Sequence, residues 1–187
     1  MPTARTKLDR EDKVQEILDA ARRRLLAGGY EAMSVAAIAR ELKIAQNSVY
    51  WYFASKDELF AAAFRAILLD VGSRKPPRGA LERVVWVTDQ MARFASLHAA
   101  LRARAAHSAA VAGLLSDLDQ WIRALLLGES ESARRTREPA LAGQAFLAVV
   151  DGALSLGLPA PKRRQVVTFA YQRLLGSADP VDGGSAR

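Results

Sequence analysis

The chain has no cysteine and only two histidines among its 187 residues. Without cysteine it forms no disulfide and offers no thiolate to a metal ion. No apolar run reaches the roughly 18 residues of a membrane-spanning helix, and residues 1–12 lack the apolar core of a signal peptide. We therefore expect a cytoplasmic protein with no membrane partner.

The sequence also lacks the residue patterns of common enzymes. It has no phosphate-binding glycine loop and no His-Glu-x-x-His zinc motif. Gly152, Ser155 and Gly157 are one residue out of register for a G-x-S-x-G nucleophile turn. His98 and His107 are nine positions apart, which places them on opposite faces of a continuous helix. We predict that the protein is not an enzyme and holds no metal ion and no cofactor.

Alanine and leucine are abundant, half of the residues are hydrophobic, and a quarter are charged. This composition favours an all-α fold, and the length suffices for one large or two small domains. The net charge of +7 suits a polyanionic partner. The positive excess is not confined to one half of the chain, so charge alone assigns no function.

Residues 34–60 contain three short amphipathic segments. Ser34 can cap the earlier of two helices here, whose apolar positions follow the i, i+3, i+4, i+7 pattern: Val35, Ile38, Ala39 and Leu42. After a break at residues 43–45, a second helix carries Val49 and Phe53 on its inner side. Its outer face holds amides, a hydroxyl and three aromatic rings but no charge: Gln46, Asn47, Ser48, Tyr50, Trp51 and Tyr52.

Two helices joined by a tight turn form the helix-turn-helix geometry, in which the second helix lies in the major groove of DNA. Glutamine and asparagine pair bidentately with adenine edges, and serine pairs with either kind of base edge. Tyrosine hydroxyls suit phosphate oxygens. The spacing also permits a helical hairpin with a purely structural role, so both interpretations stay open at this point.

Residues 10–60 resemble the N-terminal domain of the TetR family of bacterial transcriptional regulators. In that family the recognition helix typically ends in Tyr-x-His/Tyr-Phe, and Ser-Lys-x-x-Leu opens the next helix. The matching residues here are Tyr50, Tyr52, Phe53, Ser55, Lys56 and Leu59. The resemblance implies base contacts from Gln46, Asn47, Ser48 and Trp51. It implies phosphate contacts from Ser34, Tyr50, Tyr52 and Lys56.

Two positions depart from the family pattern. Lys43 occupies the turn, where the family often has glycine. A positive φ there costs a lysine about 1 kcal/mol, although its ammonium could then contact a phosphate. Asn47 also stands where glycine is common, and its amide adds a base contact or demands a different tilt of the helix.

Flanking signals delimit the first and fourth helices. Asp9 and Asp12 suit the start of a first helix that Gly28-Gly29 ends, preceded by residues 1–8 as a solvated tail or a basic arm. Ser55 and Glu58 form a capping box for a helix that reaches Gly72 and links the DNA reader to the rest of the chain. Residues 73–79 are the clearest linker.

Five further helices are predicted, at residues 81–98, 99–106, 108–127, 139–156 and 161–175. Pro139 is placed as a first-turn proline. Residues 129–138 are expected to form a mobile loop. We divide the chain into a DNA-binding domain, residues 1–54, an effector-binding and dimerisation domain, residues 55–176, and a disordered tail, residues 177–187.

The resemblance implies an effector pocket within the C-terminal helices. Candidate lining residues are Phe64, Trp86, Gln90, Met91, Phe94, His98, His107 and Trp121. Trp86 and Gln90, one helical turn apart, are the best pair, and the mostly apolar set favours a hydrophobic or aromatic ligand. Side chains of this kind at helical spacing also suit a plain core, so that alternative stays open.

Residues 145–158 and the last helix resemble the C-terminal pair through which TetR-type regulators dimerise. Small residues on one face permit close helix approach. The candidate interface residues are Leu141, Ala145, Ala148, Val149, Gly152, Val166, Phe169, Ala170 and Leu174. A two-fold dimer sets two recognition helices about 34–36 Å apart, one turn of DNA. The alternative is an ordinary monomeric core.

Taken together, these features predict a DNA-binding transcriptional regulator. We expect a homodimeric repressor that a small hydrophobic or aromatic ligand releases from a palindromic double-stranded DNA operator. The alternative is an all-helical small-molecule carrier or partner-binding module without sequence-specific DNA binding.

Overall fold

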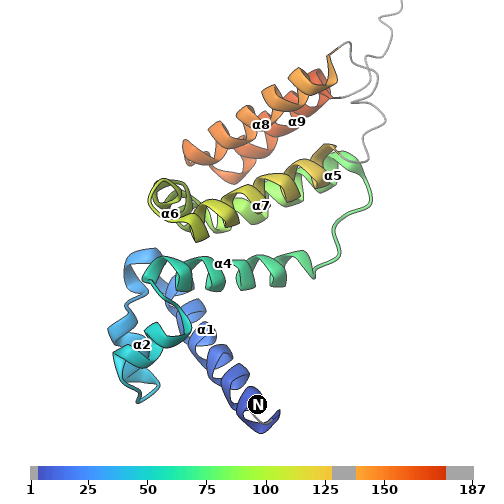
Figure 1. The fold of residues 1–187 in the computed structure, drawn as a ribbon. Helices are drawn as coiled ribbons and strands as arrows, with labels where there is room; N and C mark the ends of the chain where they lie inside the picture. The colour runs from blue at the N-terminus through green and yellow to red at the C-terminus, as the bar shows by residue number, and fades with distance from the viewer. Residues whose placement is uncertain (1–3, 128–137, 176–187) are drawn as a thin grey trace, which may run out of the picture. The chain divides into compact units, whose positions relative to one another are not determined.

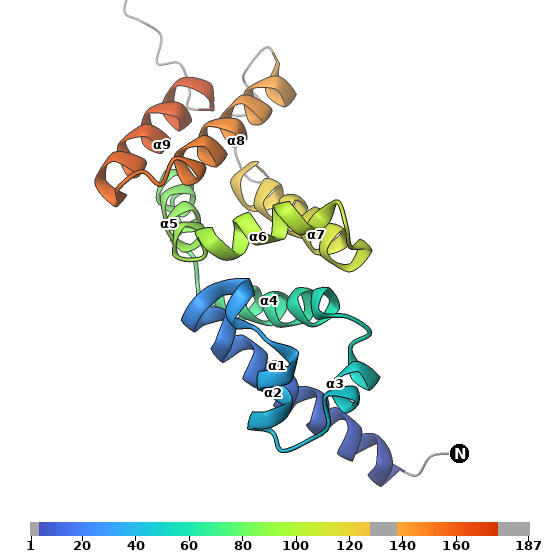
Figure 2. The same cartoon turned by 90° about the vertical axis from the view of Figure 1, so that its left-hand side faces the viewer.

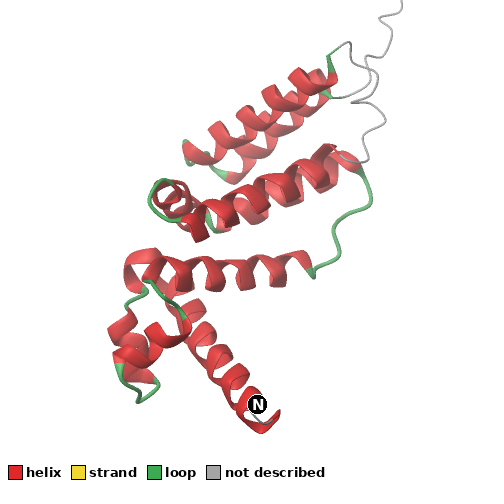
Figure 3. Ribbon diagram, in the orientation of Figure 1, coloured by secondary structure: helices red, strands yellow, loops and turns green. Residues whose placement is uncertain are grey.

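The computed structural model describes residues 4–127 and 138–175, and every regular element within these ranges is a helix (Figures 1 and 3). The helices are α1 (Ala4–Ala32), α2 (Val35–Glu41), α3 (Gln46–Tyr52), α4 (Lys56–Gly72), α5 (Ala80–Arg93), α6 (Ala95–Ala105), α7 (Ala109–Leu127), α8 (Pro139–Ser155) and α9 (Ala160–Leu174). The predicted all-α fold is confirmed. No helix in the described ranges is both long enough and apolar enough to span a membrane.

The described residues divide into two compact units. The first comprises residues 4–75 and 96–118, and the second comprises residues 76–95, 119–127 and 138–175. Helix α7 therefore contributes its first half to one unit and its second half to the other. The predicted domain boundary between residues 54 and 55 stays a prediction.

In the first unit α1 packs against α2 and α4, and α2 packs against α3 (Figure 2). Its fully buried large side chains include Ile17, Leu25, Met33, Ile38, Val49, Leu59, Phe60 and Phe64. Burying a side chain of this size contributes about 1.5–3 kcal/mol. The Phe60 ring meets Tyr30 edge-on at 5.1 Å and lies over Phe64 at 5.9 Å between ring centroids. This apolar interior holds the two short helices, α2 and α3, at fixed positions.

Ion pairs join the same helices at the surface. Arg23 and Arg24 of α1 both donate to the Glu41 carboxylate of α2, at 2.7 and 2.8 Å. These two hydrogen bonds lower the pKa of Glu41, and the one from Arg23 has the larger effect. Arg22 pairs with Asp70 of α4. The arginine run thus has partners within the protein.

The second unit is built on a helical hairpin, α8 and α9, which lie side by side and both pack against α5 (Figure 1). The Phe146 and Tyr171 rings meet edge-on at 6.0 Å inside the hairpin. At its turn, Gly157 has φ 61, and the N–H groups of Gly157 and Leu158 donate back into the last turn of α8. This pair of bonds is the Schellman motif, with glycine at the left-handed position.

Asp89 of α5 anchors the start of α9. Its carboxylate accepts from Arg163 Nη2 and from Arg164 Nε, each at 2.8 Å. Burial disfavours the charged form of Asp89, but the two arginine hydrogen bonds outweigh burial and lower its pKa. Arg163 and Arg164 lie near the N-terminal end of α9, where the helix dipole makes cations unfavourable, and the Asp89 carboxylate offsets this effect.

The predicted start of the first helix is wrong. Helix α1 begins at Ala4, so Asp9 and Asp12 lie inside it rather than at its cap, and residues 4–8 continue the helix instead of forming an arm. Residues 4–8 contain no glycine or proline, so nothing in them interrupts a helix. At the other end, Gly28 and Gly29 leave helical geometry as predicted, although hydrogen bonding continues to Ala32.

The predicted helix over residues 81–98 is also wrong, because α5 ends at Arg93. Phe94 takes φ −115 and ψ 24, and α6 begins at Ala95, so His98 belongs to α6. No glycine or proline marks this break. Residues 73–79 do separate α4 from α5, and Pro139 does open α8, as predicted. The predicted loop and tail fall mostly at residues 128–137 and 176–187, outside the described residues.

Candidate nucleic-acid interface

Helix α2 begins at the cap that the sequence predicts. The Ser34 hydroxyl accepts a hydrogen bond from the Ala37 N–H at 3.4 Å, and the Ser34 backbone is extended. Val35, Ile38 and Ala39 face inward and are buried. The cap satisfies one of the N–H groups that a helix start leaves without a partner, and it leaves the Ser34 side chain at the surface.

The turn after α2 bends through Lys43, which has φ 55 and is the one non-glycine residue with positive φ in the described part of the chain. The Ile44 N–H donates to the Ala39 carbonyl at 3.0 Å, and the Lys43 N–H donates to the Arg40 carbonyl at 3.3 Å. These bonds complete a Schellman motif with lysine at the position that usually holds glycine. The predicted positive φ is confirmed, and the Lys43 side chain is exposed.

Helix α3 has an apolar inner side and an exposed outer side. Val49 and Phe53 point inward and are 1% and 9% exposed. The Trp51 side chain is 85% exposed, and Tyr50 is 40% exposed. Of the other residues predicted to contact DNA from this helix, Gln46 and Asn47 are exposed, whereas Ser48 and Tyr52 are half-buried.

The start of α4 is capped almost as predicted. The Ser55 hydroxyl accepts from the Glu58 N–H at 3.1 Å. The Glu58 carboxylate reaches back to the Ala54 N–H at 2.8 Å, one residue before the N-cap position that a standard capping box uses. Asp57 and Glu58 in the first turn favour this helix end electrostatically. The cap therefore fixes where α4 starts, with three residues between it and the end of α3.

Lys56, the predicted phosphate ligand on α4, already has neighbours within the protein. Its ammonium lies 3.9 Å from the Glu31 carboxylate and 4.0 Å from the centre of the Tyr30 ring. The Glu31 side chain is 92% exposed, so the ion pair is weak in water. The ammonium is thus held beside the α3–α4 junction.

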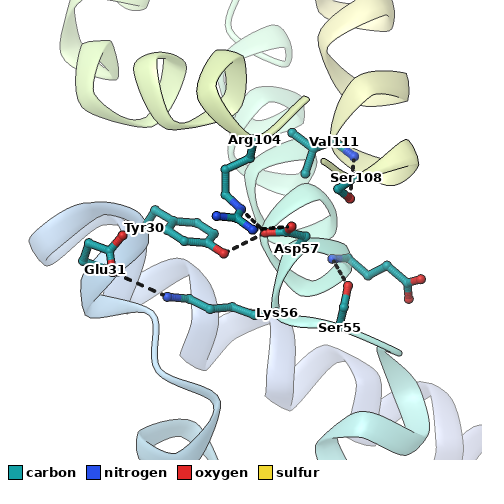
Figure 4. Close-up of polar contacts among 9 residues, drawn as sticks. Tyr30, Glu31, Ser55, Lys56, Asp57, Arg104, Ser108 and Val111 are labelled. Carbon is teal, nitrogen blue, oxygen red and sulfur yellow. Dashed lines mark hydrogen bonds and ion pairs between the residues drawn. The ribbon is translucent and has the colours of Figure 1, made fainter. Parts of the chain in front are cut away.

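Asp57, the next residue, is buried and lies at the centre of a polar cluster with two half-buried partners (Figure 4). The Tyr30 hydroxyl donates to Asp57 Oδ1 at 2.7 Å, and Arg104 of α6 donates to both carboxylate oxygens, with Nη2 to Oδ2 at 2.8 Å. The Arg104 hydrogen bonds are the largest factor that lowers the pKa of Asp57. Burial, with the Asp57 hydrogen bond, raises the pKa of Tyr30. The cluster joins the first turn of α4 to α1 and α6.

Comparison with known families bears on this arrangement of helices. Residues 17–63, which run from α1 into α4, match the family model described as bacterial regulatory proteins, tetR family. The resemblance to the TetR family is confirmed. No curated protein matches the chain. The family match thus covers the helix-turn-helix and the helices that hold it.

Solved structures extend the similarity of the fold to most of the chain. A TetR transcription regulator from Haloarcula marismortui has 19% identity and a TM-score of 0.70, over 88% of this chain and 99% of that one. A transcriptional regulator from a Rhodococcus species has 24% identity and a TM-score of 0.58, over 87% and 94%. A regulator from Pseudomonas aeruginosa, described as putative, has 20% identity and a TM-score of 0.63, over 90% and 92%. The chain has the fold of a TetR-type regulator.

The residues proposed for a TetR-type effector pocket are divided between the two units. The first unit holds Phe64, which is buried, His98, which is half-buried, and His107, which is exposed. The second holds the others: Trp86, Gln90, Met91 and Phe94, all half-buried, and Trp121, which is 40% exposed. The pocket stays a prediction.

The residues proposed for a dimer interface lie on α8 and α9. Two large apolar side chains of the set are exposed, Leu141 at 58% and Phe169 at 62%. A side chain added at Gly152 would meet no atom within 4 Å, so this face is open to close approach. Ala148 is exposed, Ala170 is buried, and the rest are half-buried: Ala145, Val149, Gly152, Val166 and Leu174. The interface also stays a prediction.

The cluster around Asp57 could not be predicted from the sequence. The sequence patterns predict no role for Asp57, Tyr30 or Arg104. The partners are 27 and 47 residues from Asp57, so no local pattern links them. A weak signal exists in the aspartate of a first helical turn, but it points to the helix end rather than to a distant arginine.

Proposed function

We propose that the protein is a homodimeric DNA-binding transcriptional repressor of the cytoplasm, which a small hydrophobic or aromatic ligand releases from a palindromic operator. One observation carries the DNA-binding part. Helix α3 turns a nearly fully exposed tryptophan and exposed amides outward while two apolar residues fix it from within. Exposed apolar surface of this kind marks an interaction site, and a helix presented after a tight turn suits the major groove.

Positive charge on either side of α3 also supports DNA binding by this helix. Lys43 precedes α3 and Lys56 follows it, whereas α3 itself carries no charge. Cations at both ends of a recognition helix suit the phosphates on either side of a groove, because phosphate contacts position a protein while base contacts specify the sequence. Ser34, Tyr50 and Tyr52 are the neutral residues of this proposed phosphate contact.

The exposed apolar side chains of the α8–α9 hairpin support the homodimer. Leu141, Phe169 and Leu156, the last 78% exposed, project from two packed helices. Side chains of this size gain about 1.5–3 kcal/mol each on burial. A second copy of the hairpin covers them and gives an isologous interface with two-fold symmetry, which matches a palindromic operator.

For ligand release, we propose that α4 transmits the signal. Its first turn lies directly after α3 and is held by Arg104 of α6 through Asp57. A ligand that shifts α6 then moves the Asp57 carboxylate, and with it the end of the recognition helix. Such a ligand acts only by binding the released arrangement more tightly than the DNA-bound one.

Selection of bound sequences from random duplexes tests the proposal. We expect a two-fold-symmetric consensus whose half-sites are about 10–10.5 base pairs apart, or a multiple of that spacing, and an affinity that falls steeply as salt rises. Lys43→Ala and Lys56→Gln should weaken binding to all sequences and each reduce the salt slope by about 1.

Lys162→Gln is the matched control, since Lys162 is an exposed lysine at the start of α9 in the other unit, and it should leave binding unchanged. A pool that shows no sequence preference after selection would contradict the proposal. That result would favour the carrier or partner-binding alternative.

A further inference from the structure

The geometry of α3 singles out two residues at the centre of its outer face. At about 100° per residue, Val49 and Phe53 define the inward direction, and Trp51 points about 180° away from it. Asn47 lies one helical turn before Trp51, about 40° from the outward direction. The exposures agree, because Trp51 is the most exposed large apolar residue in the described part of the chain, at 85%, and Asn47 is also exposed.

The outer face carries no arginine or lysine. Helix α3 reads Gln-Asn-Ser-Val-Tyr-Trp-Tyr. The commonest specific contact to guanine is a bidentate pair from arginine or lysine, whereas asparagine pairs bidentately with adenine through N6 and N7. A thymine presents a C5-methyl group, which an apolar side chain contacts. Asn47 and Trp51 therefore match the groups that an A·T base pair presents, and α3 has no arginine or lysine to contact guanine.

We propose that the outer face of α3 reads A·T base pairs, with Asn47 on an adenine edge and Trp51 against a thymine methyl group. This inference rests on the proposed function, because it assigns the chemistry of the DNA that α3 contacts. The Asn47 side-chain oxygen accepts from adenine N6–H, and its amide donates to N7. The two residues are one turn, about 5.4 Å, apart along the helix, so their bases are one or two steps apart at about 3.4 Å per step.

Four residues of α3 flank the central pair, Asn47 and Trp51. Gln46 and Tyr50 lie on one side of the central pair, and Ser48 and Tyr52 lie on the other, where both are half-buried. Tyr50 and Tyr52 carry hydroxyl groups that suit phosphate oxygens, whereas Gln46 and Ser48 stay predicted base contacts outside the central pair. Lys43, the nearest cation before α3, lies in the turn outside the helix, which suits a phosphate better than a base edge.

Modified bases in the selected duplex test the inference with the intact protein. Replacing thymine by uracil removes only the C5-methyl group, and replacing adenine by 7-deaza-adenine removes only the N7 acceptor. At the contacted positions we expect uracil to weaken binding about 4-fold, because the burial of one methyl group is lost. We expect 7-deaza-adenine to weaken it roughly 3- to 10-fold, the effect of one hydrogen bond.

Two variants assign each effect to its residue. Trp51→Ala should abolish the uracil effect and keep the 7-deaza effect, whereas Asn47→Ala should do the reverse. Both residues are exposed, so truncation leaves the buried core intact. Leu26→Ala is the matched control, because Leu26 is an exposed large apolar residue on α1, and it should keep both effects.

The outcomes separate this inference from the proposed function. A symmetric consensus made of G·C pairs at the α3 positions, or wild-type binding that ignores both modified bases, would overturn the A·T assignment and leave sequence-specific DNA binding in place. The absence of any consensus would overturn both. The modified duplexes probe the wild-type protein directly, so a variant that fails to fold does not weaken the test.

Discussion

The α2–α3 and α8–α9 hairpins close with the same turn but differ in the residue that makes it. Each turn is a Schellman motif with one residue in the left-handed region, Lys43 with φ 55 in the first and Gly157 with φ 61 in the second. Glycine adopts that conformation freely, whereas another residue pays about 1–2 kcal/mol. A lysine kept in a strained turn beside α3 therefore suggests a gain elsewhere, and a phosphate contact supplies one.

The outer faces of the two hairpins differ as well. Helix α3 presents amides and aromatic rings around Trp51, and the α8–α9 hairpin presents plain apolar side chains such as Leu141 and Phe169. Polar-tipped and aromatic groups suit the mixed edges of bases, whereas aliphatic groups suit another protein surface. The same type of turn thus supports two kinds of recognition, of DNA and of protein, and the side chains on the exposed face determine which kind each hairpin suits.

An aspartate that arginine holds also lies next to each hairpin. Asp57, just after α3, takes Arg104 and Tyr30, and Asp89 takes Arg163 and Arg164 at the start of α9. Both carboxyl groups have lowered pKa values. The hairpins therefore share a second device, and changes to these two residues compare them directly.

The largest effect is expected from removing these carboxylates. Asp57→Asn and Asp89→Asn each leave arginine without its charged partner. Each should lower the free energy of unfolding by about 1–3 kcal/mol, less than for a fully buried pair because Arg104 and Arg164 are partly exposed. Urea denaturation measures both. Asp70→Asn, at a far more exposed carboxylate, is the control, and a loss there as large as at Asp57 would contradict this account.

Replacing Phe169 should separate the two outer faces. Phe169→Glu places a charge in the proposed dimer interface and should weaken dimerisation by about 2 kcal/mol or more, roughly 30-fold. Phe169→Leu keeps an apolar side chain and should keep the dimer. Sedimentation equilibrium measures the dissociation constants. A Phe169→Glu protein that dimerises as tightly as wild type would show that the hairpin face is not the interface.

Acid should weaken both hairpin anchors together. Because the folded-state pKa values of Asp57 and Asp89 are lowered, their stabilising effect is present above the ordinary aspartate value of 3.8 and is lost as pH falls through the folded-state values. The stability difference between wild type and either Asp→Asn variant should therefore be constant near neutral pH and shrink below about pH 4. Urea midpoints measured from pH 7 to pH 2.5 would show this, and a difference that persists unchanged at the lowest pH would refute it.

The smallest effects are expected at the two turns, with opposite signs. Lys43→Gly should raise the free energy of unfolding by up to about 1 kcal/mol, since relief of strain exceeds the extra freedom of glycine in the unfolded chain, and it should weaken DNA binding. Gly157→Ala should lower it by about 1 kcal/mol. A side chain at Gly157 would meet no atom within 4 Å, so only backbone strain acts there.

Chemical denaturation and duplex titration of the two turn variants give both readouts. Stability changes of the same sign, or full DNA affinity in Lys43→Gly, would remove the functional explanation for the lysine.

Local signals predicted much of the first unit. Ser34, Ser55 and Lys43 act within a few residues of themselves, through caps and a backbone angle, and the structure has them as the sequence indicated. The inward positions of Val49 and Phe53 also follow from helical spacing alone. Patterns whose cause and effect lie within one helical turn are visible in sequence.

The errors have a common origin in longer-range packing. Helix α5 ends at Phe94 without glycine or proline, so the change of direction is set by what the helices pack against rather than by propensity. Arg104 contacts Asp57, which is 47 residues away in the sequence, and Arg163 contacts Asp89, which is 74 residues away. A charged residue in a sequence does not say which of many partners it meets, so both anchors emerged only with the fold.

The most direct test of the account is hydroxyl-radical footprinting of the protein with and without the selected duplex. Trp51 and Phe169 are both strongly exposed within this chain, at 85% and 62%. If α3 lies against the bases and the α8–α9 hairpin lies against a second copy, saturating DNA should sharply reduce the oxidation of Trp51 and leave that of Phe169 unchanged. Trp51 oxidised as fast in the saturated complex as in the free protein would contradict the proposal that α3 reads DNA.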